Sequence, residues 1–225
     1  MSLSRLYAFT AALAGATALA APPAWAIPIV AGSQLDFVGG VSPIGGTDVY
    51  NGTGVDFRTS GLASVGVPGT IGLANTVDGS FLVFSALTCP NFTTGGCGTI
   101  VDLTSFVQNS STLTTPPLPV MSFVTVTQGA VIATFDLTSF VTTQANPTVN
   151  QLGTLTLNGA GTLHLTGFDP TPGIFTLTAQ GPQNTSFSAS VVAQAVPVPE
   201  PASLAFLGAG LVAMGVVRRK ANRAN

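Results

Sequence analysis

Few residues of this chain could carry acid–base or nucleophilic chemistry. The sequence has one histidine, His164, and seven aspartates spread from residue 36 to residue 169. An activated serine needs a base beside it, and no GxSxG turn precedes a helix in this chain. His164 lies on the polar side of the alternating segment 162–166, as a surface strand residue does. We therefore expect no catalytic residue and no enzyme; a hydrolase that uses a pair of aspartates is the alternative.

Calcium is the metal that the aspartates could bind, because Ca²⁺ prefers oxygen ligands on loops. Asp48, Asp78 and Asp169 all lie in segments expected to turn. No D-x-[DN]-x-[DN]-G loop is present, and aspartates in turns commonly accept backbone N–H groups instead. The sequence therefore predicts neither a metal site nor a cofactor.

The N-terminus has the three parts of an export signal. Arg5 precedes an apolar stretch at 6–21, and Ala24-Trp25-Ala26 has the small-x-small form of a signal peptidase site. This pattern predicts a signal peptide over residues 1–26, with the mature chain beginning at Ile27. An uncleaved N-terminal helix is the alternative.

The two cysteines, Cys89 and Cys97, bracket seven residues and are the only ones in the chain. In the oxidising compartment to which an export signal leads, two cysteines so placed are expected to form a disulfide. A metal site is the competing interpretation, but it has no CxxC pair and only one histidine to draw on.

The C-terminal region, residues 196–225, is built in three parts. Alternating prolines over 196–201 favour an extended, unpaired peptide, because proline fixes its own φ and restricts the residue before it. An uncharged apolar run follows at about 202–217, near the short end of the length that spans a bilayer as a helix. The basic tail 218–225 then predicts retention on the cytoplasmic side. A plain single-pass anchor would explain these features too.

The order Pro199-Glu200-Pro201, short apolar helix and Arg218-Arg219-Lys220 resembles the PEP-CTERM sorting signal of Gram-negative bacteria. The resemblance implies that an exosortase recognises Pro199, Glu200, Pro201, Arg218 and Arg219 and removes the helix and tail. It also implies a route through the inner membrane and periplasm to the cell surface or extracellular matrix. Association with exopolysaccharide and biofilm is part of the same expectation.

The region between the two signals, residues 27–195, has a size that suits one domain. It contains seven aspartates, one arginine (Arg58), and no lysine or glutamate, so its net charge is −6. Nucleic acid and anionic lipid both attract clustered Lys and Arg, so electrostatic binding of either is excluded. Frequent Val, Leu, Ile and Phe indicate a packed core beneath a neutral polar surface.

Short alternating segments predict an all-β domain, an antiparallel β-sandwich that could be jelly-roll-like. Two hairpins are expected, one turning at Asn158–Gly161 and one joining 174–180 to 185–192. Residues 39–75 are expected to be loop with short edge strands, and 110–119 an exposed connection. The other expected strands are 35–38, 54–57, 80–87, 99–103, 120–127 and 131–137.

One six-residue sequence occurs twice: Asp102–Val107 is repeated as Asp136–Val141. We interpret it as a recurring turn in which the aspartate caps backbone N–H groups, and a duplicated ligand site as the alternative. A lectin-like, carbohydrate-binding domain remains a second functional hypothesis. Such a domain would need exposed aromatic rings that stack on sugars. Tyr50 is the only tyrosine of residues 27–195, and Trp25 is removed with the expected signal peptide.

Overall fold

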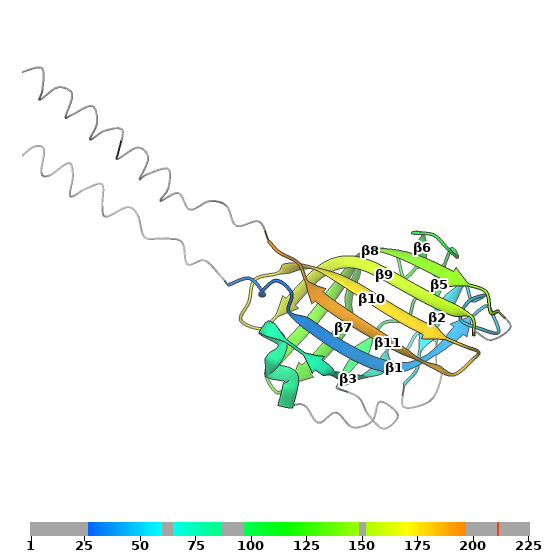
Figure 1. Ribbon diagram of the computed structural model, residues 1–225, viewed down its shortest axis with the longest axis horizontal. Helices are drawn as coiled ribbons and strands as arrows, with labels where there is room; N and C mark the ends of the chain where they lie inside the picture. Colours follow the sequence, from blue (N-terminus) through cyan, green and yellow to red (C-terminus); the bar gives the residue numbers. More distant parts are fainter. Residues whose placement is uncertain (1–26, 60–64, 87–96, 149–151, 197–210, 212–225) are drawn as a thin grey trace, which may run out of the picture. The chain divides into compact units, whose positions relative to one another are not determined.

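The computed structural model describes residues 27–59, 65–86, 97–148, 152–196 and Leu211. These residues form eleven β-strands and one 3₁₀ helix, and strands β8, β9, β10, β11 and β1 lie side by side in Figure 1. The strands run as follows: β1 Gln34–Ile44, β2 Gly54–Phe57, β3 Gly69–Val77, β4 Gly98–Ile100, β5 Ser105–Phe106, β6 Leu113–Thr115, β7 Val120–Gln128, β8 Val131–Ala145, β9 Thr154–Leu165, β10 Thr171–Gln180 and β11 Thr185–Ala193.

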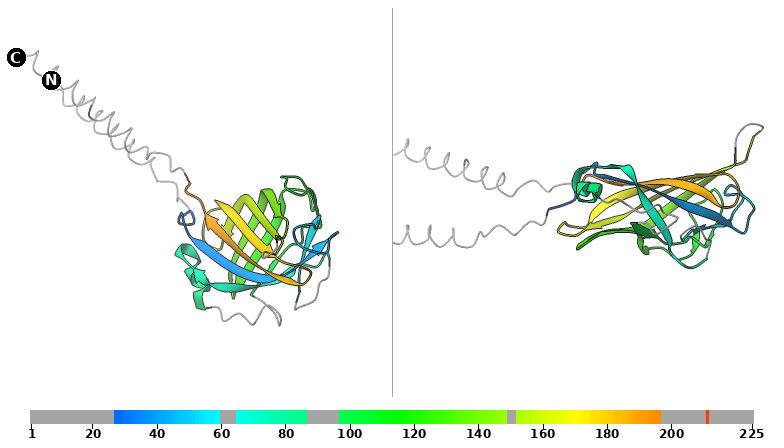
Figure 2. Two further views of the ribbon diagram at one scale, coloured as in Figure 1. Left: turned by 45° about the vertical axis from the view of Figure 1, so that its right-hand side comes forward. Right: turned by 90° about the horizontal axis from the view of Figure 1, so that it is seen from below.

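The main sheet closes on itself. Its order is β11-β10-β9-β8-β7-β4-β3-β1-β2, and β11 also pairs with β1 from Gln34↔Val192 to Val41↔Thr185. All neighbouring strands are antiparallel, so β1, β3, β4 and β7 to β11 form a closed eight-stranded barrel, seen from two further sides in Figure 2. The predicted sandwich is therefore wrong, although the all-β, antiparallel class is confirmed.

Strands β2 and β3 form one interrupted strand along β1. Val41↔Phe57 pairs β2 with the second half of β1, and Gly39↔Ile71 pairs β3 with the first half. The chain leaves the barrel after Phe57 and returns at Gly69. We call residues 58–68 the excursion, of which the structure describes 58, 59 and 65–68.

Phenylalanine rings fill the interior of the barrel. Five of them, contributed by β1, β2, β7, β10 and β11, form a closed circuit in which each ring contacts the next at 5.1–6.4 Å between centroids. All five are at most 3% exposed. Such a barrel core is a packed interior rather than a ligand cavity. The members are Phe37, Phe187, Phe57, Phe123 and Phe175.

Strand β9 runs straight through the residues expected to turn, so the first predicted hairpin is wrong. Its pairing with β8 extends from Ala145↔Thr154 to Ala133↔Leu165. A Cβ on Gly161 would lie 1.9 Å from the carbonyl oxygen of Asp136, and one on Gly159 would lie 2.4 Å from the Leu137 side chain. These glycines therefore allow close packing within a strand rather than a turn. The second predicted hairpin, β10 with β11, is confirmed.

The apolar segment expected to form a strand at 80–87 is instead the 3₁₀ helix η1, Gly79–Ala86. Phe81 and Phe84 are buried, while Leu82 and Val83 are 55% and 42% exposed. Burial at i and i+3 is the spacing of a 3₁₀ helix, because side chains three apart eclipse each other. The expectation of loop over 39–75 is wrong as well, since it missed most of β3 and the second half of β1.

Replacing Phe175 by Ala should destabilise the barrel by about 3–5 kcal/mol, because the ring contacts Phe37, Phe123 and Phe135 and no solvent can replace those contacts. Ile174→Ala is the matched control, since its side chain is 43% exposed in the same strand. Its cost should stay below about 1 kcal/mol. Urea unfolding of both variants measures the difference, and equal losses would contradict the packing described here.

Candidate functional site

His164 and Asp136 form a side-chain pair on neighbouring strands. The imidazole Nε2 lies 2.9 Å from Oδ2 of Asp136. The His164 side chain is 42% exposed and that of Asp136 is 9% exposed. The other carboxylate oxygen, Oδ1, accepts the backbone N–H of Ser122 at 2.6 Å. Asp136 therefore holds the imidazole in one orientation, and β7, β8 and β9 all contribute to the arrangement.

This arrangement supplies a base and the group that orients it, which are two of the three parts of a hydrolytic triad. Among the described residues, no serine or threonine hydroxyl makes a hydrogen bond to His164. Ser122 contributes its backbone N–H rather than its hydroxyl. The pair was missed from the sequence because Asp136 and His164 are 28 residues apart and meet only through the β8–β9 register.

Asp102 lies where the interrupted strand breaks. Its Oδ1 accepts the N–H of Phe57 at 2.7 Å, and its Oδ2 accepts the N–H of Gly66 at 2.8 Å. Phe57 ends β2 and Gly66 belongs to the excursion, so one carboxylate joins both to the barrel. The carboxylate replaces the strand partner that Phe57 would otherwise lack at this break.

Burial raises the pKa of Asp102 to about 6, because desolvation disfavours the charged form more than the two backbone N–H groups favour it. The carboxylate of Asp56, which is also buried, raises the pKa further. A buried carboxyl with a raised pKa is one feature of acid–base sites, and Asp102 has this feature. However, both oxygens of Asp102 already accept backbone hydrogen bonds, so the site primarily serves the fold.

The two copies of the repeated sequence have matching environments. Asp102 and Asp136 are both buried and both accept backbone N–H groups, which confirms the capping role expected for them. The following leucines are fully buried, and the phenylalanines, Phe106 and Phe140, contact each other at 6.2 Å. The second copy, however, lies within strand β8 rather than in a turn.

The three aspartates considered for calcium do not share a site. Asp48 accepts the N–H of Tyr50 at 3.2 Å, next to its bridge with Pro182 beyond the end of β10. Asp78 accepts the N–H of Gly79 at 2.6 Å at the start of η1, and Asp169 pairs with Pro28 just before β10 begins. No group of three or more potential ligands gathers within the described residues.

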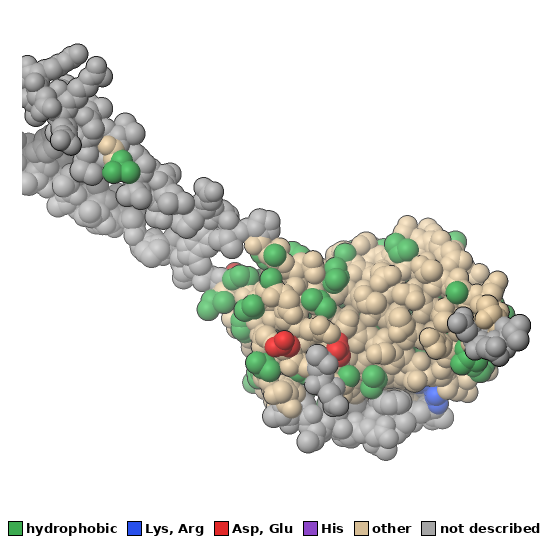
Figure 3. Space-filling view, viewed as in Figure 1, with side chains coloured by type: hydrophobic (Ala, Val, Ile, Leu, Met, Phe, Trp, Pro, Cys, Tyr) green, Lys and Arg blue, Asp and Glu red, His purple; other side chains and the backbone are tan. Residues whose placement is uncertain are grey.

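The outer face of β8 to β11 and β1 is polar and nearly uncharged. Figure 3 shows few acidic or basic side chains on it. Cross-strand rows of small polar side chains explain this: Ser190 pairs with Thr176, which pairs with Asn158. A shallow hollow on the same face is lined by Val38, Leu152, Thr178, Gln180, Thr185, Ser186, Phe187 and Ser188.

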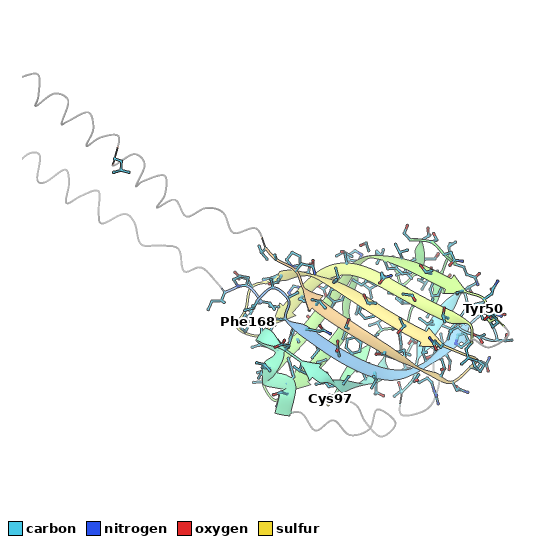
Figure 4. The ribbon with its side chains drawn as sticks, viewed as in Figure 1. Tyr50, Cys97 and Phe168 are labelled. Carbon is cyan, nitrogen blue, oxygen red and sulfur yellow. The ribbon has the colours of Figure 1, made fainter. Side chains whose placement is uncertain are left out.

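Tyr50, the ring considered for sugar stacking, is only partly exposed. A Cβ on Gly153 would lie 2.2 Å from this ring, so the ring packs directly on the backbone there. Figure 4 shows Tyr50 at the opposite end of the barrel from Phe168. The structure thus places no freely exposed aromatic platform at this residue.

Several predicted site residues lie outside the described part of the chain. They include Cys89, so the disulfide with Cys97 stays a prediction. Ile27, the expected first residue of the mature chain, is 65% exposed. The others outside are the cleavage residues Ala24 and Ala26 and the sorting residues Pro199, Glu200, Pro201, Arg218 and Arg219.

Within the residues that can be described, no helix is both long and apolar enough to cross a membrane. The structure therefore gives no support to the transmembrane helix expected at 202–217, of which it describes Leu211 alone, in helical conformation.

Comparison with known proteins identifies the C-terminal region. The family model of the PEP-CTERM protein-sorting motif matches residues 197–220. The chain therefore carries a PEP-CTERM sorting signal at its C-terminal end. This signal implies export, sorting to the envelope or surface, and processing by an exosortase-type enzyme. No curated protein and no solved structure matches the chain.

Asp102 should make stability depend on pH. Because its folded pKa is raised above the ordinary value of 3.8, the folded state favours the protonated form. The contribution of the protonated Asp102 side chain to the free energy of unfolding therefore increases as pH falls from about 6 towards 4. This contribution is lost as pH rises through about 6. We expect the difference in free energy of unfolding between the unmodified protein and the Asp102→Asn variant to change with pH. It should shift in favour of the unmodified protein by roughly 1–2 kcal/mol when the pH is lowered from 7 to 4.

Urea unfolding at four pH values between 4 and 7 measures this difference. Asp78→Asn, which removes one negative charge from an exposed site, is the control for the change in net charge. A difference that stays flat, or that falls at low pH, would contradict the raised pKa of Asp102.

Proposed function

We propose that this protein is a non-enzymatic component of the cell surface or extracellular matrix that associates with exopolysaccharide. The observation that carries the proposal is the position of the sorting motif. It begins at residue 197, directly after a barrel whose last strand ends at Ala193. The barrel is therefore the cargo that the signal delivers.

The structure of the barrel supports a binding or structural role over catalysis. Phenylalanine rings occupy its interior, so substrate cannot enter there. Among the described residues, no serine or threonine hydroxyl forms a hydrogen bond with His164 of the His164–Asp136 pair. The buried carboxylate of Asp102 is engaged by backbone N–H groups.

The proposed route has two stages. The apolar run at 202–217 first holds the exported chain at the membrane, with the barrel on the outer side. Cleavage near the Pro-Glu-Pro sequence then removes this run and the basic tail and lets the barrel move to the surface or matrix. The absence of lysine from residues 27–195 and their net charge of −6 favour neutral polysaccharide over polyanions as the partner.

A lectin-like domain is the second candidate. The observation that favours it is the hollow on β10 and β11, which presents Thr178, Gln180, Ser186 and Ser188 as neutral hydrogen-bonding groups. Hydroxyl and amide groups of this kind can bind sugar hydroxyls without charge. The partly buried ring of Tyr50 weakens this candidate, because it offers little surface for stacking on a sugar.

Replacing Pro199, Glu200 and Pro201 together by alanine should block processing. The intact chain, ending at Asn225, should then accumulate in the membrane fraction of a host that has an exosortase. Mass spectrometry of the envelope and secreted fractions measures both termini. Val198→Ala is the control and should be processed normally. Normal trimming and surface delivery of the triple variant would refute the sorting role of these residues.

The lectin-like candidate makes a separate prediction for the hollow. Ser186→Val combined with Ser188→Val should weaken binding of processed protein to a neutral host polysaccharide by about tenfold or more, because two hydrogen-bonding groups are lost. Ser139→Val, an exposed hydroxyl on β8, is the control. Titration calorimetry measures the affinities, and unchanged binding in the double variant would exclude the hollow as the site.

A further inference from the structure

One end of the barrel exposes a cluster of aliphatic side chains, which we call the apolar end patch. Its members come from the N-terminal segment, η1 and the start of β8. Each of these side chains is 42–65% exposed. In Figure 3, hydrophobic side chains gather over the end of the barrel where β1 and β10 begin. The members are Ile27, Val30, Leu82, Val83 and Ile132.

Hydrogen bonds show that these segments are neighbours. The N–H of Asp169, in the turn before β10, donates to the carbonyl of Ile27 at 3.0 Å. The N–H of Val30 donates to Oγ of Ser80 in η1 at 3.0 Å, which places Leu82 and Val83 beside it. On the other side, the N–H of Thr166 donates to the carbonyl of Ile132 at 3.0 Å. The N-terminal segment, η1 and the start of β8 therefore all lie at the same end of the barrel.

The domain begins and ends at this same rim. Ile27 is the first described residue, and Gly32 donates its N–H to the carbonyl of Ala193, the last residue of β11. Gln194 then donates to the carbonyl of Pro172 at 2.8 Å, which is the last backbone bond of the barrel. Seven residues, 195–201, separate it from the apolar run, so this connection spans at most about 25 Å.

From these observations we infer that the apolar end patch rests on the lipid bilayer surface before processing. This inference depends on the proposed function, in which the run at 202–217 holds the chain at the membrane. A connection this short keeps the patch at a high local concentration beside the lipid, so contacts that are individually weak become effective. Cleavage removes that advantage and releases the barrel.

The chemistry of the patch fits lipid better than protein. It contains aliphatic side chains only, whereas protein interfaces are enriched in Trp, Tyr and Arg. Figure 4 shows Phe168 at this end, and that ring is half-buried against the core. The acidic groups nearby are Asp78 and Asp169. Because these would be repelled by anionic headgroups, zwitterionic lipid is the expected partner.

Tryptophan fluorescence can test this contact, because the sequence has a single tryptophan, Trp25. In a Trp25→Phe background, Leu82→Trp places a reporter in the patch. Leu152→Trp places a matched reporter next to the start of β9, at the opposite end of the barrel. The two leucines are 55% and 58% exposed, so both substitutions should be tolerated.

The full-length chain is reconstituted into phosphatidylcholine vesicles that carry brominated acyl chains, and flotation confirms that it is bound. The Leu82→Trp signal should be quenched at least about twofold, and the Leu152→Trp signal should be unchanged. Adding Val30→Glu to Leu82→Trp should reduce the quenching, since a charge is costly to desolvate at the interface.

Each other outcome has a defined meaning. If the chain floats with the vesicles but neither tryptophan is quenched, the inference is wrong while membrane retention stands. Protection of the Leu82→Trp reporter from aqueous iodide without quenching by lipid would also overturn it, in favour of a protein partner or a second copy. Equal quenching of both reporters would overturn it as well. If the chain fails to float, membrane retention fails, and the inference fails with it.

Discussion

The closed circuit of five phenylalanine rings is the interaction on which the rest of this structure depends. It joins strands from both ends of the domain, since Phe37 lies on β1 while Phe175 and Phe187 lie on β10 and β11. The closed sheet surrounds these rings, which are at most 3% exposed. Gly39 makes this closure possible, because a Cβ there would lie 2.5 Å from the Phe187 ring.

Closure also decides what the surface can do. Closure removes the two free edges that an open sheet of the eight barrel strands would present, and free edges are sites at which chains aggregate. The interior is full, and every remaining function must therefore use the outer face or the ends. The outer face of β8 to β11 and β1 is nearly uncharged and rich in hydroxyl and amide groups, whereas one rim exposes aliphatic side chains. This division fits the proposed contacts, with lipid before processing and with neutral polysaccharide afterwards.

Local patterns predicted some elements and misled at others for clear reasons. The alternation of apolar and polar residues over 174–180 and 185–192 was sufficient to predict the β10–β11 hairpin, because the two strands are joined by a short turn and pair with each other. Asn158-Gly159 has the composition of a turn, yet the inward positions from Leu155 to Leu165 keep an unbroken period of two. That period indicated a single strand. The Phe81 and Phe84 spacing likewise carried the signal for η1.

The sequence by itself determined the all-β class, the low charge and the sorting signal, because composition, alternation and short motifs are properties of neighbouring residues. Only the tertiary structure decided that the sheet closes, since the pairing of Gln34 with Val192 joins positions 158 residues apart. The same is true of the contact between His164 and Asp136 and of the raised pKa of Asp102. Both depend on strand register and burial, which are set by the packing of the whole barrel and not by any local pattern.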